Sequence, residues 1–113
     1  MTTCIFCRIV SGQTPARIVY RDEDIIAFHD IMPQAPTHIL VVPTRHIESA
    51  SALTDADHDL TGRLLIEAVR IAGQAGLSAG YRLVINTGRY GGQSVDHLHV
   101  HILGGRQMKW PPG

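Results

Sequence analysis

Histidine alternates with aliphatic residues in the stretch His97-Leu-His-Val-His-Ile-Leu103. Because successive side chains of a strand point to opposite faces, this alternation predicts a strand over residues 97–103. Its three imidazoles share one face, and its aliphatic side chains share the other. The aliphatic face can pack against a helix, so the imidazole face must meet either solvent or a site.

The segments before this strand predict two helices and four more strands. Apolar residues at helical spacing predict a short helix over Cys4–Ser11 that stops at Gly12. A long amphipathic helix follows the capping-box pattern Thr54-Asp-Ala-Asp57 and ends near Gly76 or Gly80. Runs of β-type residues bounded by turn residues and prolines predict the other strands, over 17–21, 25–29, 38–42 and 81–87.

Together these elements predict one α+β domain over residues 1–113. The links between the early strands are too short for parallel crossovers, so those strands must pair antiparallel. We therefore expect a five-stranded antiparallel sheet with one long and one short helix, both packed on one face of the sheet.

The composition excludes several classes of protein. Acidic and basic residues balance at ten each, so the chain lacks the basic surface expected for binding nucleic acid or an anionic membrane. No apolar run reaches the roughly 20 residues that span a bilayer, and Met1–Cys7 lacks the pattern of a secretory signal. Two cysteines are too few for a disulfide scaffold and favour a reducing compartment, which we expect to be the cytoplasm.

The histidine face allows three interpretations: a polar surface, a metal site, or a catalytic site with divided roles. In the last, one imidazole attacks, another donates protons or hydrogen bonds, and a third is structural. The Cα atoms of His97 and His101 would lie roughly 13 Å apart on a strand, so one ion would not readily take all three histidines. The loop Gly91-Gly-Gln-Ser94 favours the catalytic interpretation, because its backbone N–H groups can face an anion.

The run 97–103 resembles the signature of the histidine triad superfamily, in which three histidines alternate with hydrophobic residues. The likeness covers nearly the whole chain and extends to the Hint branch, the histidine triad nucleotide-binding proteins. Beyond the triad, the segments that carry it are Phe28–Ile31, Pro33–His38, Asn86, Gly91–Val95, Gly104–Met108 and Trp110–Gly113. The triad alone points to the superfamily, whereas the Gln-Ser loop and the Trp-Pro-Pro-Gly tail point to the branch.

The resemblance implies a hydrolase that cleaves purine nucleoside 5′-phosphoramidates, conjugates of AMP or GMP with an amine, and needs no cofactor for catalysis. His99 would carry the nucleotidyl group in a covalent intermediate, and protonated His101 would contact the phosphate or the leaving group. His38 would support the histidine cluster, and Ser94 would complete the catalytic set. The implied nucleotide contacts are Phe28 and Ile31 for the base, Asp30 for the ribose, and Asn86, Gly92, Gln93 and Ser94 for the phosphate and leaving group.

Alternative functions remain open at this point. A dinucleoside polyphosphate hydrolase belongs to the same superfamily, and a nucleotide-binding scaffold could retain the pocket with little turnover. A third alternative is a metal hydrolase in which His97 and His99 are ligands.

The pair Cys4-Ile-Phe-Cys7 also has three interpretations: unrelated thiols, a redox pair or half of a zinc site. A redox pair of this spacing is expected after a strand, and no strand precedes it here. Zinc needs two more ligands, for which His46 and His97 are the candidates. Some bacterial histidine triad proteins resemble this arrangement, whereas eukaryotic Hint proteins generally lack the cysteines. A structural zinc is therefore an expectation that the Hint branch does not itself imply.

The resemblance further implies a homodimer. Hint-like proteins pair through a strand and the long helix to form one continuous sheet, and the run 81–87 carries apolar residues on both faces. Symmetric pairing of an edge strand would cover its exposed backbone. The tail contains the one tryptophan of the chain, Trp110, and would reach the partner's active site to select the leaving group.

Overall fold

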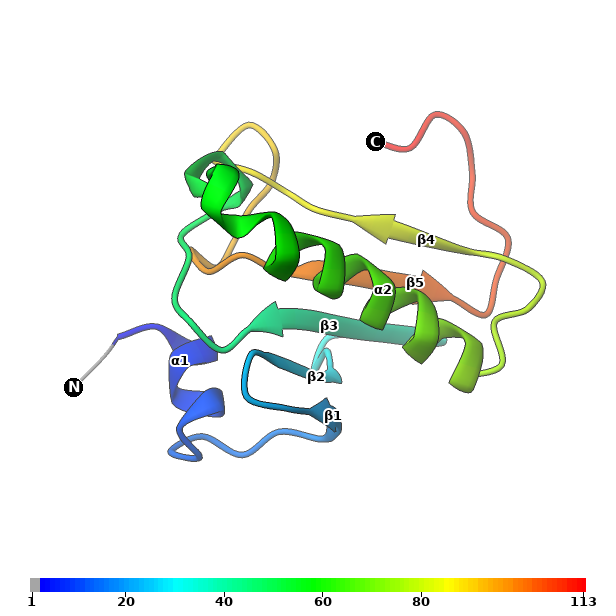
Figure 1. Ribbon diagram of the computed structural model, residues 1–113. Helices are drawn as coiled ribbons and strands as arrows, with labels where there is room; N and C mark the ends of the chain where they lie inside the picture. Colours follow the sequence, from blue (N-terminus) through cyan, green and yellow to red (C-terminus); the bar gives the residue numbers. More distant parts are fainter. Residues whose placement is uncertain (1–2) are drawn as a thin grey trace.

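The computed structural model describes residues 3–113, which form one five-stranded antiparallel sheet (Figure 1). The strand order is β1-β2-β3-β5-β4, and every neighbouring pair is antiparallel, as predicted. The strands are β1 (Ile18–Arg21), β2 (Ile25–His29), β3 (Thr37–Pro43), β4 (Tyr81–Val84) and β5 (Val100–Gly104). Met1 and Thr2 lie outside the described residues. The predicted domain and the segment examined for a secretory signal both begin with these two residues.

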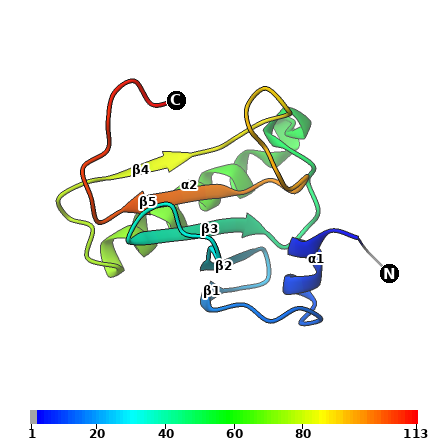
Figure 2. The same cartoon turned by 180° about the vertical axis from the view of Figure 1, so that it is seen from behind.

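The two helices cover opposite faces of the sheet, so the prediction that both pack on one face is wrong. The long helix α2 (His58–Gln74) buries Leu64, Ala68 and Ile71 against one face. The short helix α1 (Ile5–Val10) buries Phe6 and Ile9 against the other. Figure 1 shows α2 in front of the sheet, and Figure 2 shows it behind.

The reason for this arrangement lies in the central strands. Residues 25–28 and 39–42 are uninterrupted apolar runs, and all eight side chains are buried. A strand without alternation needs cover on both faces, so these runs require a second layer. These two apolar runs are visible in the sequence, and they predict a layer on each face of the sheet even though the sequence contains only one long helix.

The histidine strand begins later than predicted. β5 pairs with β3 from Val100 onward, with Val41 opposite Val100. Before it, the main-chain N–H of Leu98 donates to the Ile47 carbonyl at 2.6 Å, and the N–H of His97 donates to the Val95 carbonyl at 2.9 Å. These bonds replace the sheet ladder over 97–99 and turn the chain out of the sheet.

The faces of residues 97–102 nevertheless alternate as predicted. The aliphatic residues at 98, 100 and 102 belong to the core beneath α2. On the other side, the rings of His97 and His99 contact Phe6 of α1. The histidine face therefore meets a short helix and a pocket.

The start of the long helix confirms the predicted capping box. The Thr54 side chain accepts a hydrogen bond from the main chain of the first turn, and the Asp57 side chain accepts from the main-chain N–H of Thr54. This turn is the 3₁₀ segment η2 (Asp55–Asp57), which lies just before α2. A further 3₁₀ turn, η1 (Ala50–Ala52), precedes it. None of the helices formed by residues 3–113 is both long and apolar enough to cross a membrane.

Candidate active site

The proton on His99 is fixed by the main chain. Its Nδ1 donates to the carbonyl oxygen of His97 at 2.6 Å, so in the neutral ring Nε2 carries the lone pair. The side chain is 4% exposed. It is held between the Phe6 ring, nearly perpendicular with centroids 5.1 Å apart, and the His101 ring at 4.8 Å. His99 is thus a buried base or nucleophile with one available nitrogen.

A chain of hydrogen bonds sets the protons of His38 and His101. The main-chain N–H of Gln34 donates to His38 Nδ1 at 3.0 Å, which leaves the His38 proton on Nε2. That Nε2 donates to His101 Nδ1 at 2.9 Å and lies 3.5 Å from a carboxylate oxygen of Asp30. The His101 proton is therefore on Nε2. Among the described residues this buried nitrogen has no hydrogen-bond partner, so it is the group available to a substrate.

The electrostatics of the pair keep both imidazoles neutral near pH 7. Burial lowers the pKa of His101 to about 4, with the nearby His99 and His38 adding to the effect and Asp30 opposing it. Burial also lowers the pKa of His38. In the protein alone, the surroundings of His101 disfavour the protonated form that the resemblance implies for the bound state.

A cavity of about 240 Å³ opens beside His99 and His101. Six predicted site residues line it: Phe28, Asp30, Ile31, Ser94, His99 and His101. Much of the lining is apolar and comes from α1 and the segment after it: Ile5, Phe6, Ile9, Pro15 and Ala16. The cavity therefore joins an apolar compartment, suited to a flat ring, to a polar end that holds the imidazoles and the Ser94 hydroxyl.

The sequence did not predict the α1 wall as part of the pocket. The helical spacing of Ile5, Phe6 and Ile9 was visible, but nothing local connected that helix to a strand some 90 positions later. The uninterrupted apolar runs of β2 and β3, which need cover on both faces, were the signal that could have found it.

Three predicted phosphate contacts do not line this cavity: Asn86, Gly92 and Gln93. The Gln93 side chain has a structural task, since its amide oxygen accepts from the Gly88 N–H at 2.9 Å and its amide nitrogen donates to the Glu48 carbonyl at 2.8 Å. Gly92 adopts a φ of 80°, which favours glycine. These residues shape the loop that brings Ser94 to the pocket.

The other end of the histidine run joins the cysteine pair. The ligand atoms of Cys4, Cys7, His46 and His97 all lie within 4.8 Å of one another. The two imidazole Nδ1 atoms are 3.2 Å apart, and the Sγ–Nδ1 distances are 3.3, 3.3 and 3.6 Å. A tetrahedral zinc with ordinary bond lengths separates two nitrogens by about 3.3 Å and a sulfur from a nitrogen by about 3.6 Å. The donor set and its spacing therefore fit zinc.

The protonation of His97 also suits a ligand. Its Nε2 donates to the Pro43 carbonyl at 2.8 Å, which leaves the Nδ1 lone pair pointing at the cysteines. Burial lowers the pKa of His97, so the ring stays neutral, the form that binds metal. His99 is outside this cluster, which removes the geometric basis for a metal hydrolase with His97 and His99 as ligands.

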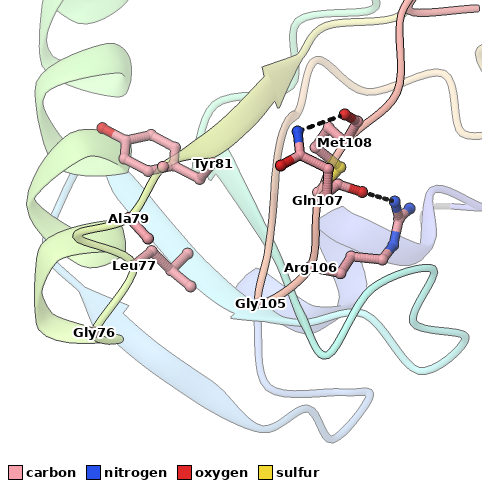
Figure 3. A pocket seen from close by; sticks show the side chains of 9 residues that line it. Gly76, Leu77, Ala79, Tyr81, Gly105, Arg106, Gln107 and Met108 are labelled. Atoms are coloured by element: carbon pink, nitrogen blue, oxygen red, sulfur yellow. Dashed lines mark hydrogen bonds between the residues drawn. The ribbon is translucent and has the colours of Figure 1, made fainter.

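A second, larger depression of about 530 Å³ lies where β5 ends (Figure 3). Its lining includes Leu77, Tyr81, Arg106 and Met108 but no histidine, carboxylate or cysteine. In Figure 3 the Arg106 guanidinium is engaged by the Gln107 carbonyl, and it also donates to the Gln34 carbonyl. This depression gathers no cluster of catalytic groups, so the smaller histidine pocket is the candidate active site.

Known proteins match this chain over nearly its whole length. A model of the HIT domain family matches residues 11–108. The chain is 51% identical over 109 residues to an uncharacterised HIT-like protein of Synechococcus elongatus, covering 96% of each chain. It superimposes on a HIT family hydrolase of Legionella pneumophila with a TM-score of 0.96 and 50% identity, covering 98% of this chain and 100% of that one. A histidine triad nucleotide-binding protein of Candida albicans gives a TM-score of 0.82 and 28% identity, covering 96% of this chain and 83% of that one.

Proposed function

The chain belongs to the HIT family, and from that premise we propose that it is a hydrolase that cleaves purine nucleoside 5′-phosphoramidates through a covalent nucleotidyl intermediate on His99. One observation carries this proposal: the main chain holds the His99 proton on Nδ1 and leaves Nε2 as a lone pair beside the cavity. Neutral imidazole is a good nucleophile near pH 7, and its phosphoramidate is labile enough to hydrolyse.

In the first step, His99 Nε2 attacks phosphorus and the substrate's P–N bond breaks. The electron pair of that bond goes to the departing amine, which takes a proton from solvent as it leaves. His101 stays neutral, in keeping with its lowered pKa of about 4, and its Nε2–H would donate to the phosphate oxygen on which negative charge develops. The products of the step are the free amine and nucleotidyl-His99.

In the second step, water attacks the same phosphorus and the bond to His99 breaks. The water gives its proton to solvent, the electron pair of the broken bond returns to His99 Nε2, and the nucleoside monophosphate leaves. His38 keeps the His101 proton on the nitrogen that faces the substrate, because its own Nε2–H occupies the other ring nitrogen. No step needs a cofactor.

The pocket supports a nucleotide as the substrate. Phe28 and Ile31 lie in the wall of the cavity where the base would bind, and Asp30 lies between them in sequence, where its carboxylate would accept from the ribose hydroxyls. The Ser94 hydroxyl would donate to the phosphate. We propose a purine nucleotide conjugate because the apolar wall from α1 offers a flat ring a broad contact surface.

We also propose that Cys4, Cys7, His46 and His97 hold a structural zinc. Four protein ligands complete a tetrahedral shell, so such an ion would have no open position and would supply a cross-link instead of chemistry. It would tie α1 to the segment after β3 and to the start of the histidine run.

A homodimer is proposed from the apolar residues that the protomer leaves at its surface. Leu65, Ile66 and Val69 share one face of α2 and are 40–59% exposed. β4 is the last strand of the sheet and pairs only with β5 among the described strands. Pairing of β4 and α2 with a second copy would cover both. Trp110, which is 85% exposed, would then find a surface on the partner.

Release of AMP from adenosine 5′-phosphoramidate tests the proposed function. The wild-type protein should release AMP and amine in equal amounts, and His99→Ala should bind AMP without turnover. Faster cleavage of a dinucleoside polyphosphate than of the phosphoramidate would assign the related hydrolase activity instead. Binding of AMP with no cleavage of either compound would identify a scaffold.

A further inference from the structure

Helix α1 belongs to the metal cluster and to the nucleotide pocket at once. Cys4 caps its first turn and Cys7 lies within it, and both present sulfur to His97. Between them in sequence, Phe6 faces the pocket together with Ile9. Two sites that appear separate along the chain therefore share one six-residue helix.

Phe6 is the side chain through which the two sites make contact. Its ring lies edge-on to His97 of the metal cluster, with centroids 5.7 Å apart, and edge-on to His99 of the pocket at 5.1 Å. It also contacts the Phe28 ring at 5.4 Å. A displacement of Phe6 would alter the wall of the base compartment and the support of the nucleophile together.

The main chain provides a second connection. The His97 ring is held by the cysteines on one side and by the Pro43 carbonyl on the other. The carbonyl of the same residue fixes the His99 proton. Contacts that immobilise the His97 side chain therefore also fix its carbonyl oxygen, which holds the proton of His99 on Nδ1.

Besides the cysteines, α1 is held by the packing of its two buried side chains in a core cluster with β2 and β3, and by the Arg21 guanidinium, which donates to the Val10 carbonyl. A helix of six residues is far shorter than the roughly 12–15 residues at which isolated helices become even marginally stable in water. Its buried residues are Phe6 and Ile9. In Figure 1 it lies at one end of the sheet, at the start of the chain and joined onward by the link to β1. Ligation through Cys4 and Cys7 would add a second anchor, at the start of this short helix, to the packing of its buried side chains.

We propose that metal binding and nucleotide binding are energetically coupled through Phe6 and the His97 carbonyl, so that the metal-loaded protein binds nucleotide more tightly than the metal-free protein. This inference rests on the proposed nucleotide pocket and on the proposed zinc. Because coupling between two sites is reciprocal, nucleotide tightens metal binding by the same factor. We expect a factor of about ten, within the usual range for coupled sites.

The experiment measures AMP affinity by calorimetry in zinc-loaded protein and in protein stripped by a chelator, with circular dichroism to verify folding. The reverse measurement follows Zn²⁺ affinity by competition with a chelating dye, with and without saturating AMP. Both should give the same factor. Phe6→Leu keeps an apolar side chain but removes the ring contacts, and it should reduce the factor toward one. Ile9→Val, on the same pocket wall, should weaken AMP binding in both forms and leave the factor unchanged.

A second measurement uses only metal-loaded protein, so that the proposal can be tested even if the metal-free protein does not fold. Cobalt replaces zinc at such sites and gives absorption bands that report on its cysteine ligands. AMP should shift these bands in the wild type and not in Phe6→Leu.

Equal AMP affinity with and without zinc, or cobalt bands that AMP leaves unmoved in the wild type, overturns the coupling and leaves the proposed function standing. Failure to bind zinc also overturns it. Failure of both metal forms to bind AMP removes the proposed function together with the coupling.

Discussion

His97 and His99 lie two residues apart on the same face of one segment, yet their surroundings give them different tasks. Both nitrogens of His97 are engaged, Nδ1 by the cysteine cluster and Nε2 by the Pro43 carbonyl. Only one nitrogen of His99 is engaged, and the ring borders a cavity. The chemistry of an imidazole is thus decided by what its second nitrogen faces. The position of a histidine within the repeated motif does not decide it.

Replacing His97 and His99 in turn should separate their tasks with the largest effects. His99→Ala should lower kcat for AMP phosphoramidate hydrolysis by roughly 10⁴-fold or more, because it removes the nucleophile, while zinc content stays near wild type. His97→Ala should lose zinc and stability first. Steady-state kinetics, metal analysis and thermal melts on both variants test this. A His99→Ala protein with wild-type turnover would contradict the covalent mechanism.

Removing the metal should lower the stability of the folded protein, because the proposed zinc cross-links the His97 end of the histidine run. If zinc is present at 1,000 times its dissociation constant, it stabilises the folded protein by about 4 kcal/mol. Stripping it, or replacing Cys4 by Ser, should lower the unfolding free energy by about that amount in urea titrations. His58→Ala serves as the control, because that side chain is 80% exposed and lies outside the cluster. An unchanged urea midpoint after chelation would show that the cluster holds no stabilising ion.

Acid should destabilise the protein by favouring protonation of the histidines buried beside the pocket. His101 and His38 have folded-state pKa values below the ordinary value of 6.5. A depressed histidine pKa favours the folded state fully above pH 6.5, and this stability is lost as pH falls toward the folded pKa, about 4 for His101. The melting temperature should therefore fall between pH 7 and pH 4. His101→Asn should flatten this dependence, and the exposed His58→Asn should not. Equal slopes for the two variants would refute the assignment to His101.

The tail should give the smallest effect. The Arg82 guanidinium donates to the Lys109 carbonyl at 2.7 Å and holds the tail beside the edge strand β4. In the proposed dimer this places Trp110 near the partner. Deleting residues 107–113 should change the relative rates for substrates that differ in the leaving amine by several-fold and leave AMP affinity unchanged. Sedimentation should show a dimer before and after deletion. Identical relative rates would remove the tail from substrate selection.

The sequence predicted the parts of this molecule that depend on local patterns. The alternation over 97–102 identified the face of each histidine, and the box at Thr54–Asp57 identified the start of the long helix. The layer formed by α1 was not predicted, because it depends on contacts between Phe6 and residues more than 90 positions away. The task of Gln93 was also hidden, since its partner carbonyl on Glu48 comes from another segment.

The proton positions could not be predicted from sequence at all. They follow from single main-chain groups, the His97 carbonyl and the Gln34 N–H, whose placement requires the folded backbone. These two groups nevertheless decide which nitrogen of each catalytic imidazole faces the substrate.

The central claim is that His99 Nε2 is the nucleophile, and trapping the intermediate tests it most directly. Wild-type protein is mixed with adenosine 5′-phosphoramidate, quenched within milliseconds at alkaline pH to preserve the acid-labile phosphorus–nitrogen bond, and fragmented for mass spectrometry. We expect one adenylyl group per chain, located on His99 and absent from His99→Ala. An adenylyl group on His97 or His101, or turnover with no labelled histidine at any quench time, would contradict it.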